Sequence, residues 1–318
     1  GRPPQGPHGP AAARELGKHT MTNFDFLGKA KFFVPLSLGL VALSVVLILT
    51  LGLRAGVDFT GGTQFTVIFS EPVTTEEVRA LLGTVPAPGV DLSQAQIQDL
   101  GGRPGKVITV PVDVEREREV VEAIERALSA HPAVEEISRV SIGAQVSREL
   151  MRRAWQAVLI ALGAILVYIS WRFRLRYAVG AIAALVHDVV IALGVFSLFQ
   201  VEINLPVIAA FLTIVGYSLN DTIVIFDRVR ENLKLMKKAS VFEVINRSVN
   251  QSLSRTINTS LTTFIPVVIL FALGGPVLRG FALALLIGVI VGTYSSMYVA
   301  NPVLYWWTKR AERAKGRA

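Results

Sequence analysis

Six apolar runs dominate this sequence, and each is long enough to cross a lipid bilayer. About 20 predominantly apolar residues suffice for one crossing as an α-helix. More than half of the 318 residues are hydrophobic (52%), and a globular protein of this length would carry fewer long apolar runs. The sequence therefore predicts an integral membrane protein. The runs lie near residues 32–53, 154–171, 177–201, 203–226, 256–278 and 280–307.

A polar segment of soluble-domain composition, residues 54–146, separates the first run from the second. Its residue pattern alternates between strands and amphipathic helices in the order βαββαβ, which is typical of a ferredoxin-like sandwich. We therefore predict a membrane bundle of six transmembrane helices plus one extracytoplasmic α+β ferredoxin-like domain between the first and second helices. The expected strands are 64–70, 94–100, 106–111 and 135–145, and the expected helices are 74–82 and 114–130.

Lys and Arg gather in four regions: the N-terminal flank, the loop 172–176, the stretch 227–250 and the C-terminal tail. These regions alternate with loops that are poor in basic residues, so the positive-inside rule places them all in the cytoplasm. Both termini are then cytoplasmic, in the inner membrane. We expect a disordered cytoplasmic tail (1–31), a first helix (32–53), a five-helix bundle (147–308) and a basic cytoplasmic tail (309–318).

The stretch 227–250 is basic and amphipathic. It is interpreted either as a surface helix on the cytoplasmic leaflet or as a segment that docks a partner.

Several kinds of site are excluded or disfavoured by composition. The chain has no cysteine, and its four histidines show no paired spacing, so we expect no metal site. We expect no cofactor, because the glycine spacings of dinucleotide and phosphate loops are absent. The net charge of +8 lies at the ends of apolar runs and forms no basic patch interleaved with aromatic residues, so nucleic acid is not an expected partner.

Two charged residues lie at matching depths in neighbouring membrane runs. Asp221 lies in the fourth run, and Arg255 opens the fifth. Charges at such positions are costly, and they usually serve ion movement or conformational coupling. Burial raises the pKa of a carboxyl group and a nearby arginine lowers it again, so Asp221 could bind a proton in one conformation and release it in another. The alternative is a static ion pair that fixes the register of the two helices.

Polar residues extend both of these helix faces by steps of three and four. Tyr217 and Asn220 lie beside Asp221, and Asn258 and Thr262 follow Arg255. We expect the two polar faces to meet inside the bundle, where lipid cannot reach.

A second carboxylate, Asp188, lies near the middle of the third run beside His187. It extends a proton path or serves as a polar packing residue, and the sequence does not decide between these two roles. Asp58, Gly61 and Gly62 directly follow the first run, and this composition favours a structural turn that leads into a strand.

Three segments resemble the motifs of the SecD/SecF family of protein-export membrane proteins. The segment from Tyr217 to Asn232 (YSLNDTIVIFDRVREN) resembles the family's signature. The segment from Asn250 to Ser260 (NQSLSRTINTS) resembles its companion motif on the next helix, and the segment from Val57 to Gly62 (VDFTGG) resembles the motif after the first helix. With six spans and one external domain, the resemblance covers nearly the whole chain after the N-terminal tail.

The resemblance implies a transporter fold of the resistance-nodulation-division superfamily and a role in protein export, not enzymatic catalysis. It implies that Asp221 carries the proton, that Arg255 is its basic partner and that the proton gradient is the energy source. The implied partners are SecD, which would supply the other six helices, the SecYEG channel, and an unfolded preprotein as substrate. YajC and YidC are further candidate partners.

Two other functions remain as alternatives. One is a small-molecule or lipid exporter of the same superfamily, which the single small external domain disfavours. The other is a scaffold that stabilises the channel and uses Asp221 and Arg255 only for assembly. An enzyme is the weakest interpretation, because no nucleophile and base pair, metal cluster or phosphate loop is present.

Overall fold

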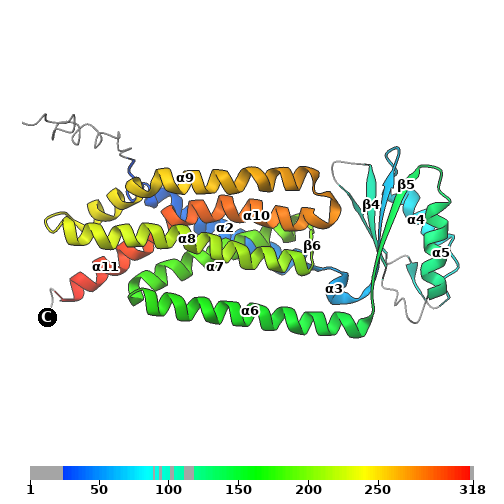
Figure 1. The fold of residues 1–318 in the computed structure, drawn as a ribbon, viewed down its shortest axis with the longest axis horizontal. Helices are drawn as coiled ribbons and strands as arrows, with labels where there is room; N and C mark the ends of the chain where they lie inside the picture. The colour runs from blue at the N-terminus through cyan, green and yellow to red at the C-terminus, as the bar shows by residue number, and fades with distance from the viewer. Residues whose placement is uncertain (1–23, 89, 93–94, 101–103, 111–117, 316–318) are drawn as a thin grey trace, which may run out of the picture.

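The computed structural model describes residues 24–88, 90–92, 95–100, 104–110 and 118–315. Long helices form a bundle, and a small α+β domain lies at one end of it (Figure 1). We call the end of the bundle next to this domain the outer end and the opposite end the inner end. The bundle helices are α2 (Ala30–Leu51), α6 (Ala144–Arg172), α7 (Leu175–Phe199), α8 (Leu205–Leu235), α9 (Val241–Leu273) and the continuous run of α10 (Gly275–Ser295), the π-helical turn η2 (Ser296–Ala300) and α11 (Asn301–Lys315).

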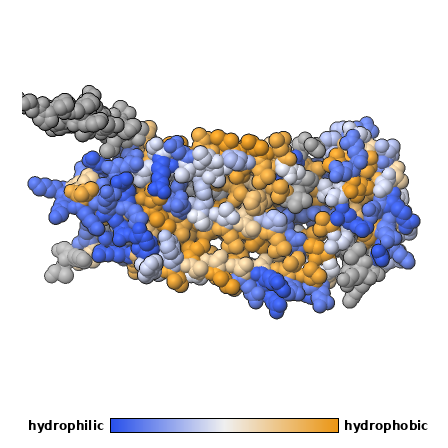
Figure 2. All heavy atoms as spheres, viewed as in Figure 1, coloured by the Kyte–Doolittle hydropathy of each residue, from blue (hydrophilic) through white to orange (hydrophobic). Residues whose placement is uncertain are grey.

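Within the described residues, six helices are long and apolar enough to cross a membrane. At about 1.5 Å per residue even α2, with 22 residues, spans about 33 Å, which matches the apolar thickness of a bilayer. Apolar side chains cover the middle of the bundle, and hydrophilic residues gather at both ends (Figure 2). Trp171 and Leu49 are 84% and 79% exposed, as expected of side chains that face lipid. The predicted fold class is confirmed.

The external domain has the predicted βαββαβ order. Its antiparallel sheet has the strand order β3-β4-β2-β5. The two helices pack on the sheet face that points away from the bundle, and Phe65, Val67 and Ile108 are buried beneath them (Figure 1). The strands are β2 (Gly62–Phe69), β3 (Gln96–Asp99), β4 (Gly105–Val110) and β5 (Val134–Ile142), and the helices are α4 (Thr75–Gly83) and α5 (Arg118–Ser129).

The first helix of the domain begins where the sequence predicts. The Thr74 side chain accepts a hydrogen bond from the backbone N–H of Glu77, and the Glu77 side chain accepts one from the N–H of Thr74. The expected strand 135–145 ends earlier than predicted, because Gly143 starts α6 and the helix continues from there. Residues 111–117, the start of the expected helix 114–130, lie outside the described residues.

The expected disordered tail 1–31 is wrong for its last part. Residues 1–23 lie outside the described residues, but Phe24 to Leu27 are held against α9. The side chain of Asn246 accepts hydrogen bonds from the N–H groups of Phe26 (2.8 Å) and Leu27 (3.1 Å), and Asn250 accepts one from Phe24 (2.8 Å). In the expected basic tail 309–318, the residues as far as Lys315 are helical, since α11 continues.

The stretch 227–250 is not a separate surface helix. It consists of the inner end of α8, the turn 236–240 and the start of α9, so α8 and α9 form one long helical hairpin. The reason is a second capping box, in which Ser240 accepts from the N–H of Glu243 and the Glu243 side chain accepts from the N–H of Ser240. This Ser-x-x-Glu spacing is visible in the sequence and restarts the helix at Val241.

Three short elements connect the domain to the bundle. β1 (Arg54–Ala55) follows α2 and pairs in parallel with β6 (Glu202–Ile203), which joins α7 to α8. The single-turn helix α3 (Val57–Thr60) then leads into β2. The domain is therefore fastened to the start of α8 as well as to its own two connections.

Candidate functional site

Asp221 lies in the middle of α8 and is 3% exposed. One carboxyl oxygen, Oδ2, is buried without a hydrogen-bond partner in the described part of the chain, and so is the hydroxyl of Tyr217, one turn away. Buried polar atoms are nearly always hydrogen-bonded, because an unmet one costs free energy. An unpartnered carboxyl oxygen is therefore a strong indication of a functional group.

Arg255 lies level with Asp221 across the helical hairpin. Each residue is 15 positions from the turn 236–240, so both lie about 22 Å along their helices from it. Arg255 and Thr259 are close enough to act electrostatically on the Asp221 carboxyl. No ion pair within 4.0 Å joins Asp221 to Arg255 in the described residues, which include both. The static ion pair that the sequence offered as an alternative is therefore absent in this conformation, although the matching depth is present.

We expected the polar faces of α8 and α9 to meet inside the bundle, but they do so only in part. Asp221 and the Tyr217 hydroxyl point inward, but Asn220, Arg255 and Asn258 are exposed on the outside of this chain. Thr262 is also exposed and bonds back to its own helix, at the carbonyl of Asn258 (2.8 Å). The supporting roles assigned to Asn220, Asn258 and Thr262 stay predictions.

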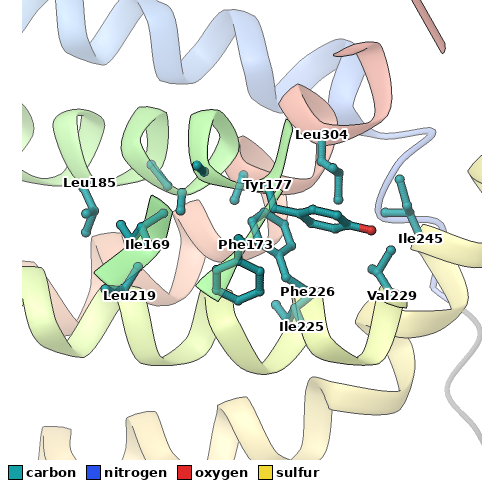
Figure 3. Packing of buried hydrophobic residues seen from close by; sticks show 14 of the residues in the cluster. Ile169, Phe173, Tyr177, Leu185, Leu219, Ile225, Phe226, Val229, Ile245 and Leu304 are labelled. Carbon is teal, nitrogen blue, oxygen red and sulfur yellow. The ribbon is translucent and has the colours of Figure 1, made fainter. Parts of the chain in front are cut away.

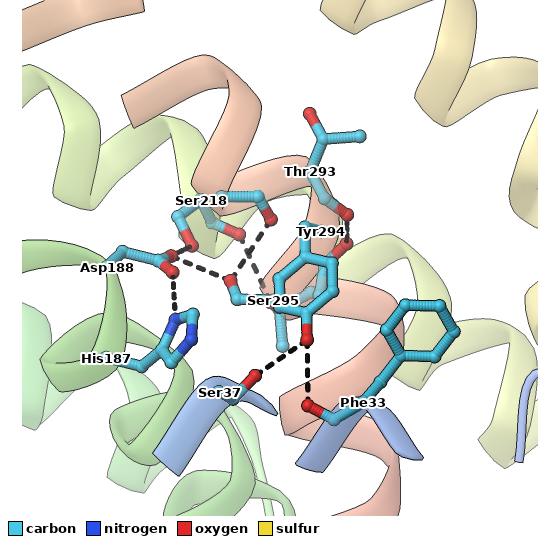
Figure 4. A network of polar contacts seen from close by, with 11 residues as sticks. Phe33, Ser37, His187, Asp188, Ser218, Thr293, Tyr294 and Ser295 are labelled. Atoms are coloured by element: carbon cyan, nitrogen blue, oxygen red, sulfur yellow. Dashed lines mark hydrogen bonds and ion pairs between the residues drawn. The ribbon is translucent and has the colours of Figure 1, made fainter. Parts of the chain in front are cut away.

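Asp188 on α7 is fully buried and fully hydrogen-bonded (Figure 4). Its Oδ2 accepts bonds from the hydroxyls of Ser218 on α8 (2.5 Å) and Ser295 on α10 (2.8 Å). Its Oδ1 lies 2.9 Å from Nδ1 of His187. The carboxyl group thus joins three membrane helices at one point.

The network around Asp188 continues to α2 through Tyr294. The Tyr294 ring stacks on His187 at 6.0 Å between centroids, and its hydroxyl lies 2.8 Å from Ser37 Oγ (Figure 4). Sequence reasoning missed Ser218, Ser295 and Tyr294. Ser218 could have been found, because it lies one turn before Asp221 on the same buried face of α8.

An apolar plug lies between Asp221 and the inner end of the bundle. Phe226 is fully buried and packs edge-on against Tyr177 (5.3 Å between centroids) and Phe173 (6.1 Å) (Figure 3). Ile225 and Val229 extend the same cluster along α8. Such a cluster excludes water and separates Asp221 from the inner surface in this conformation.

The residues that follow the first helix form a junction with α8 and α6. Asp58 Oδ2 accepts a hydrogen bond from the N–H of Leu205 (2.8 Å), which is the first residue of α8. Gly61 (φ 72°) and Gly62 (φ 116°) adopt backbone angles that favour glycine. A Cβ on Gly61 would lie 3.2 Å from Ser147 Oγ, so the glycine also permits α3 to approach α6.

No group of three or more His, Cys, Asp or Glu side chains is arranged to hold a metal ion within the described ranges.

Family comparisons agree with this architecture. The profile described as "Protein export membrane protein SecD/SecF, C-terminal" matches residues 121–310, and the "SecD/SecF GG Motif" profile matches residues 46–73. The protein translocase subunit SecF of Petrotoga mobilis is 41% identical over 302 residues, which cover 93% of this chain and 99% of that protein. The GG-motif match includes Asp58, Gly61 and Gly62.

Two crystal structures of SecDF are similar in fold. The first, described as a translocon-associated membrane protein from Thermus thermophilus, superimposes with a TM-score of 0.82 at 38% identity. The alignment covers 94% of this chain and 41% of the SecDF chain, so this chain spans about two fifths of it. The second, a super-membrane-facing form of SecDF, gives a TM-score of 0.66 at 40% identity, with 93% of this chain and 40% of that chain covered.

Proposed function

This chain belongs to the SecD/SecF family of protein-export membrane proteins, and on that premise we propose that it uses the proton motive force, together with a SecD partner, to promote preprotein export across the cytoplasmic membrane. The observation that carries the proposal is Asp221, a carboxyl group buried inside the helical bundle with one oxygen unpartnered. An intramembrane acid in this condition is a functional group by default, and proton relays are built from such residues.

The proposed proton cycle uses the distance between Asp221 and Arg255. A proton that enters from the outer side neutralises Asp221 and removes its attraction to Arg255. When the proton leaves, the charged carboxylate again favours an approach of the two helices. Since the two groups act on each other without a direct ion pair, a small shift of α8 against α9 suffices to change their separation.

The apolar plug is proposed as the inner gate of the proton path. Phe226 and Phe173 lie between Asp221 and the inner end of the bundle. Proton release to the inner side would require the plug to open. This makes α8, which carries both Asp221 and Phe226, the moving element of the cycle.

Asp188 is proposed as a fixed anchor of the same site. Its carboxyl group accepts hydrogen bonds from two serine hydroxyls and lies against a histidine nitrogen. Hydrogen bonds of this kind hold the carboxyl group in a fixed position between the helices. Asp188 therefore holds α7, α8 and α10 together while Asp221 titrates.

The outward polar side chains support a second membrane half. Asn220, Asn258 and Thr262 would face lipid if this chain were alone, although polar groups in hydrocarbon are costly. The SecD partner's helices are proposed to cover this face and to complete the surroundings of Arg255. In the Thermus relative, SecD and SecF parts lie in one SecDF chain.

The external domain is proposed to transmit the cycle to the substrate. α8 begins at Leu205, whose N–H is bound by Asp58, and continues as one helix through Asp221. A shift of α8 therefore acts directly on the base of the external domain. An unfolded preprotein that leaves the SecYEG channel would be the substrate of this movement, with both termini of this chain in the cytoplasm, as the basic loops favour.

The test is gradient-stimulated preprotein export in vesicles that contain the SecD partner, the Sec channel and Asp221→Asn. The amide keeps the shape of the side chain and removes the titration. We expect the complex to assemble while the proton gradient no longer accelerates export. The matched control is Glu231→Gln, ten residues further along α8 on an exposed position, which should keep full stimulation. Stimulation that persists in Asp221→Asn would favour the scaffold alternative.

A further inference from the structure

Glu202 projects from the outer end of the bundle into the base of the external domain. It lies in β6, between the last residue of α7 and the first of α8, and it is partly buried. Its carboxylate accepts hydrogen bonds from the Gln64 side chain (Oε2, 2.9 Å), the Gln98 side chain (Oε1, 3.2 Å) and the Thr109 hydroxyl (Oε1, 3.4 Å). These three donors come from β2, β3 and β4, so one side chain of the bundle binds three strands of the domain.

The three donors share one face of the sheet. Gln64 is paired with Thr109, and Gln98 is paired with Val107, which also pairs with Thr66. Directly paired residues place their side chains on the same face, and the alternate residues Phe65 and Ile108 point to the other side. The domain core therefore occupies one face, and the polar face meets Glu202 across a cleft of about 380 Å³.

We propose that Glu202 is the positioning residue that fastens the sheet of the external domain to the outer end of α8. This inference deepens the proposed function and rests on it, because α8 is the helix that carries Asp221. The other polar attachments at this junction reach main-chain groups: Asp58 binds the N–H of Leu205, and Arg279 on α10 binds the carbonyl of Leu100. Glu202 is distinct in that its own side chain contacts side chains of three strands.

The charged groups around Glu202 give the attachment a direction of pH dependence. Arg54 is its partner across β1 and β6, and Asp58 on α3 also acts on it. Asp99 lies on the same cleft but is paired with Lys106 (2.5 Å), and Arg279 is bound to the Leu100 carbonyl. Burial raises the pKa of the Glu202 carboxyl, while Arg54 and the bonds from Gln64 and Thr109 oppose the rise.

Proton linkage determines whether a lower pH strengthens or weakens the attachment of the external domain. A carboxyl whose pKa is higher in the docked state than in the free state binds protons more strongly when docked. Docking is therefore favoured as the pH falls toward the ordinary glutamate range and is weakened as the pH rises through the raised pKa. Acidification of the outer side would hold the domain more firmly on α8.

The test is a distance measurement between two spin labels. The chain has no cysteine, so Glu76→Cys on α4 and Leu273→Cys at the outer end of α9, both exposed, give unique labelling sites in the full chain. The labelled chain is reconstituted with a cysteine-free SecD partner in lipid nanodiscs. We expect a single narrow distance in the parent protein, which broadens as the pH is raised.

Three variants decide the outcome. Glu202→Ala removes every acceptor and should give a broad distribution at all pH values. Glu202→Gln, the neutral isostere of the protonated acid, keeps an acceptor oxygen and should restore a narrow distribution that no longer responds to pH. Glu136→Ala, an exposed carboxylate on β5 of the same domain, should behave like the parent protein. A narrow distribution in Glu202→Ala, or a pH response retained in Glu202→Gln, would overturn the proposal.

This measurement tests the role of Glu202 separately from the proton-coupling role of Asp221, on which the inference rests. If Asp221→Asn abolishes gradient stimulation but Glu202→Ala leaves the distances unchanged, only the Glu202 assignment is wrong. If Glu202→Ala broadens the distances but Asp221→Asn still responds to the gradient, the fastening stands and the proton-coupling role of Asp221 fails.

Discussion

Asp188 and Asp221, two buried carboxyl groups on neighbouring helices, have opposite surroundings. Asp188 has a bonding partner on each oxygen, whereas Asp221 keeps one oxygen without a partner. We expect Asp188→Asn to lower the free energy of unfolding by about 1–3 kcal/mol, because the amide nitrogen replaces an oxygen that now accepts from hydroxyl or imidazole donors. The thermal unfolding midpoint of the purified chain in detergent measures this loss.

The control for this experiment is Asn258→Leu. The Asn258 side chain is exposed on α9, and its replacement should leave the unfolding midpoint of the isolated chain unchanged. If Asp188→Asn were equally neutral, Asp188 would not be an anchor, and a place on the proton path would become the better explanation for this residue.

For single residues, the sequence predicts the depth of a side chain along its helix better than it predicts which other side chain it contacts. Asp221 and Arg255 lie level because each helix continues without a break from the shared turn, and helical periodicity makes that visible. The bond between Asp188 and Ser295 joins residues 107 positions apart, and no local pattern contains it. Periodicity gives the face of a helix, but the neighbour on that face depends on how the whole bundle packs.

At the scale of the element, Gly61 has a backbone geometry that few residues other than glycine adopt. Its backbone angles (φ 72°, ψ 170°) are almost confined to glycine, and a Cβ would press on Ser147 of α6. We expect Gly61→Ala to destabilise the chain by about 1–3 kcal/mol and to loosen α3 from α6. Thermal unfolding gives the first quantity, and hydrogen exchange of the amides of residues 57–62 gives the second.

Gly83→Ala is the matched control for Gly61→Ala. Gly83 ends α4 with open space where a Cβ would lie, so this exchange should be neutral or slightly stabilising. If Gly61→Ala were equally harmless, the turn at Gly61 would be free to relax, and α3 could not hold α6 in place.

Two helix starts are marked in the sequence by a local capping signal. The expected helix 74–82 begins at the capping box of Thr74 and Glu77. The same signal at Ser240 and Glu243 explains why the basic stretch 227–250 is a helical hairpin and not a surface helix. The amphipathic pattern there arises because one side of the hairpin packs against the bundle, and such a pattern is the same for a helix on a protein and a helix on a membrane.

At the scale of the whole molecule, the fold class follows from hydropathy and element order, but the assembly does not. Six apolar runs and one βαββαβ segment leave few alternatives to the observed architecture. Arg255 and Asn258 are polar and exposed on the outside of the bundle. A single sequence contains no information on which partner covers them, so it does not predict the assembly.

Export should require the external domain to move relative to the bundle. Val140 on β5 and Phe199 at the end of α7 line the same cleft and are 44% and 67% exposed. Cysteines at these two positions can be treated with bismaleimides of graded length, and no native cysteine competes. We expect the crosslinked protein, assembled with its SecD partner and the channel, to lose gradient-stimulated export while ATP-driven translocation continues.

Two controls are needed to interpret the loss of gradient-stimulated export. The double-cysteine protein without reagent, and each single-cysteine protein with reagent, should export normally, which excludes damage by the substitutions or by modification alone. Loss of stimulation only in the joined protein means that α8 acts through movement of the domain. Normal stimulation in the joined protein would mean that Asp221 drives export without displacing the domain, and the helical path from Asp221 to Leu205 would then have no mechanical role.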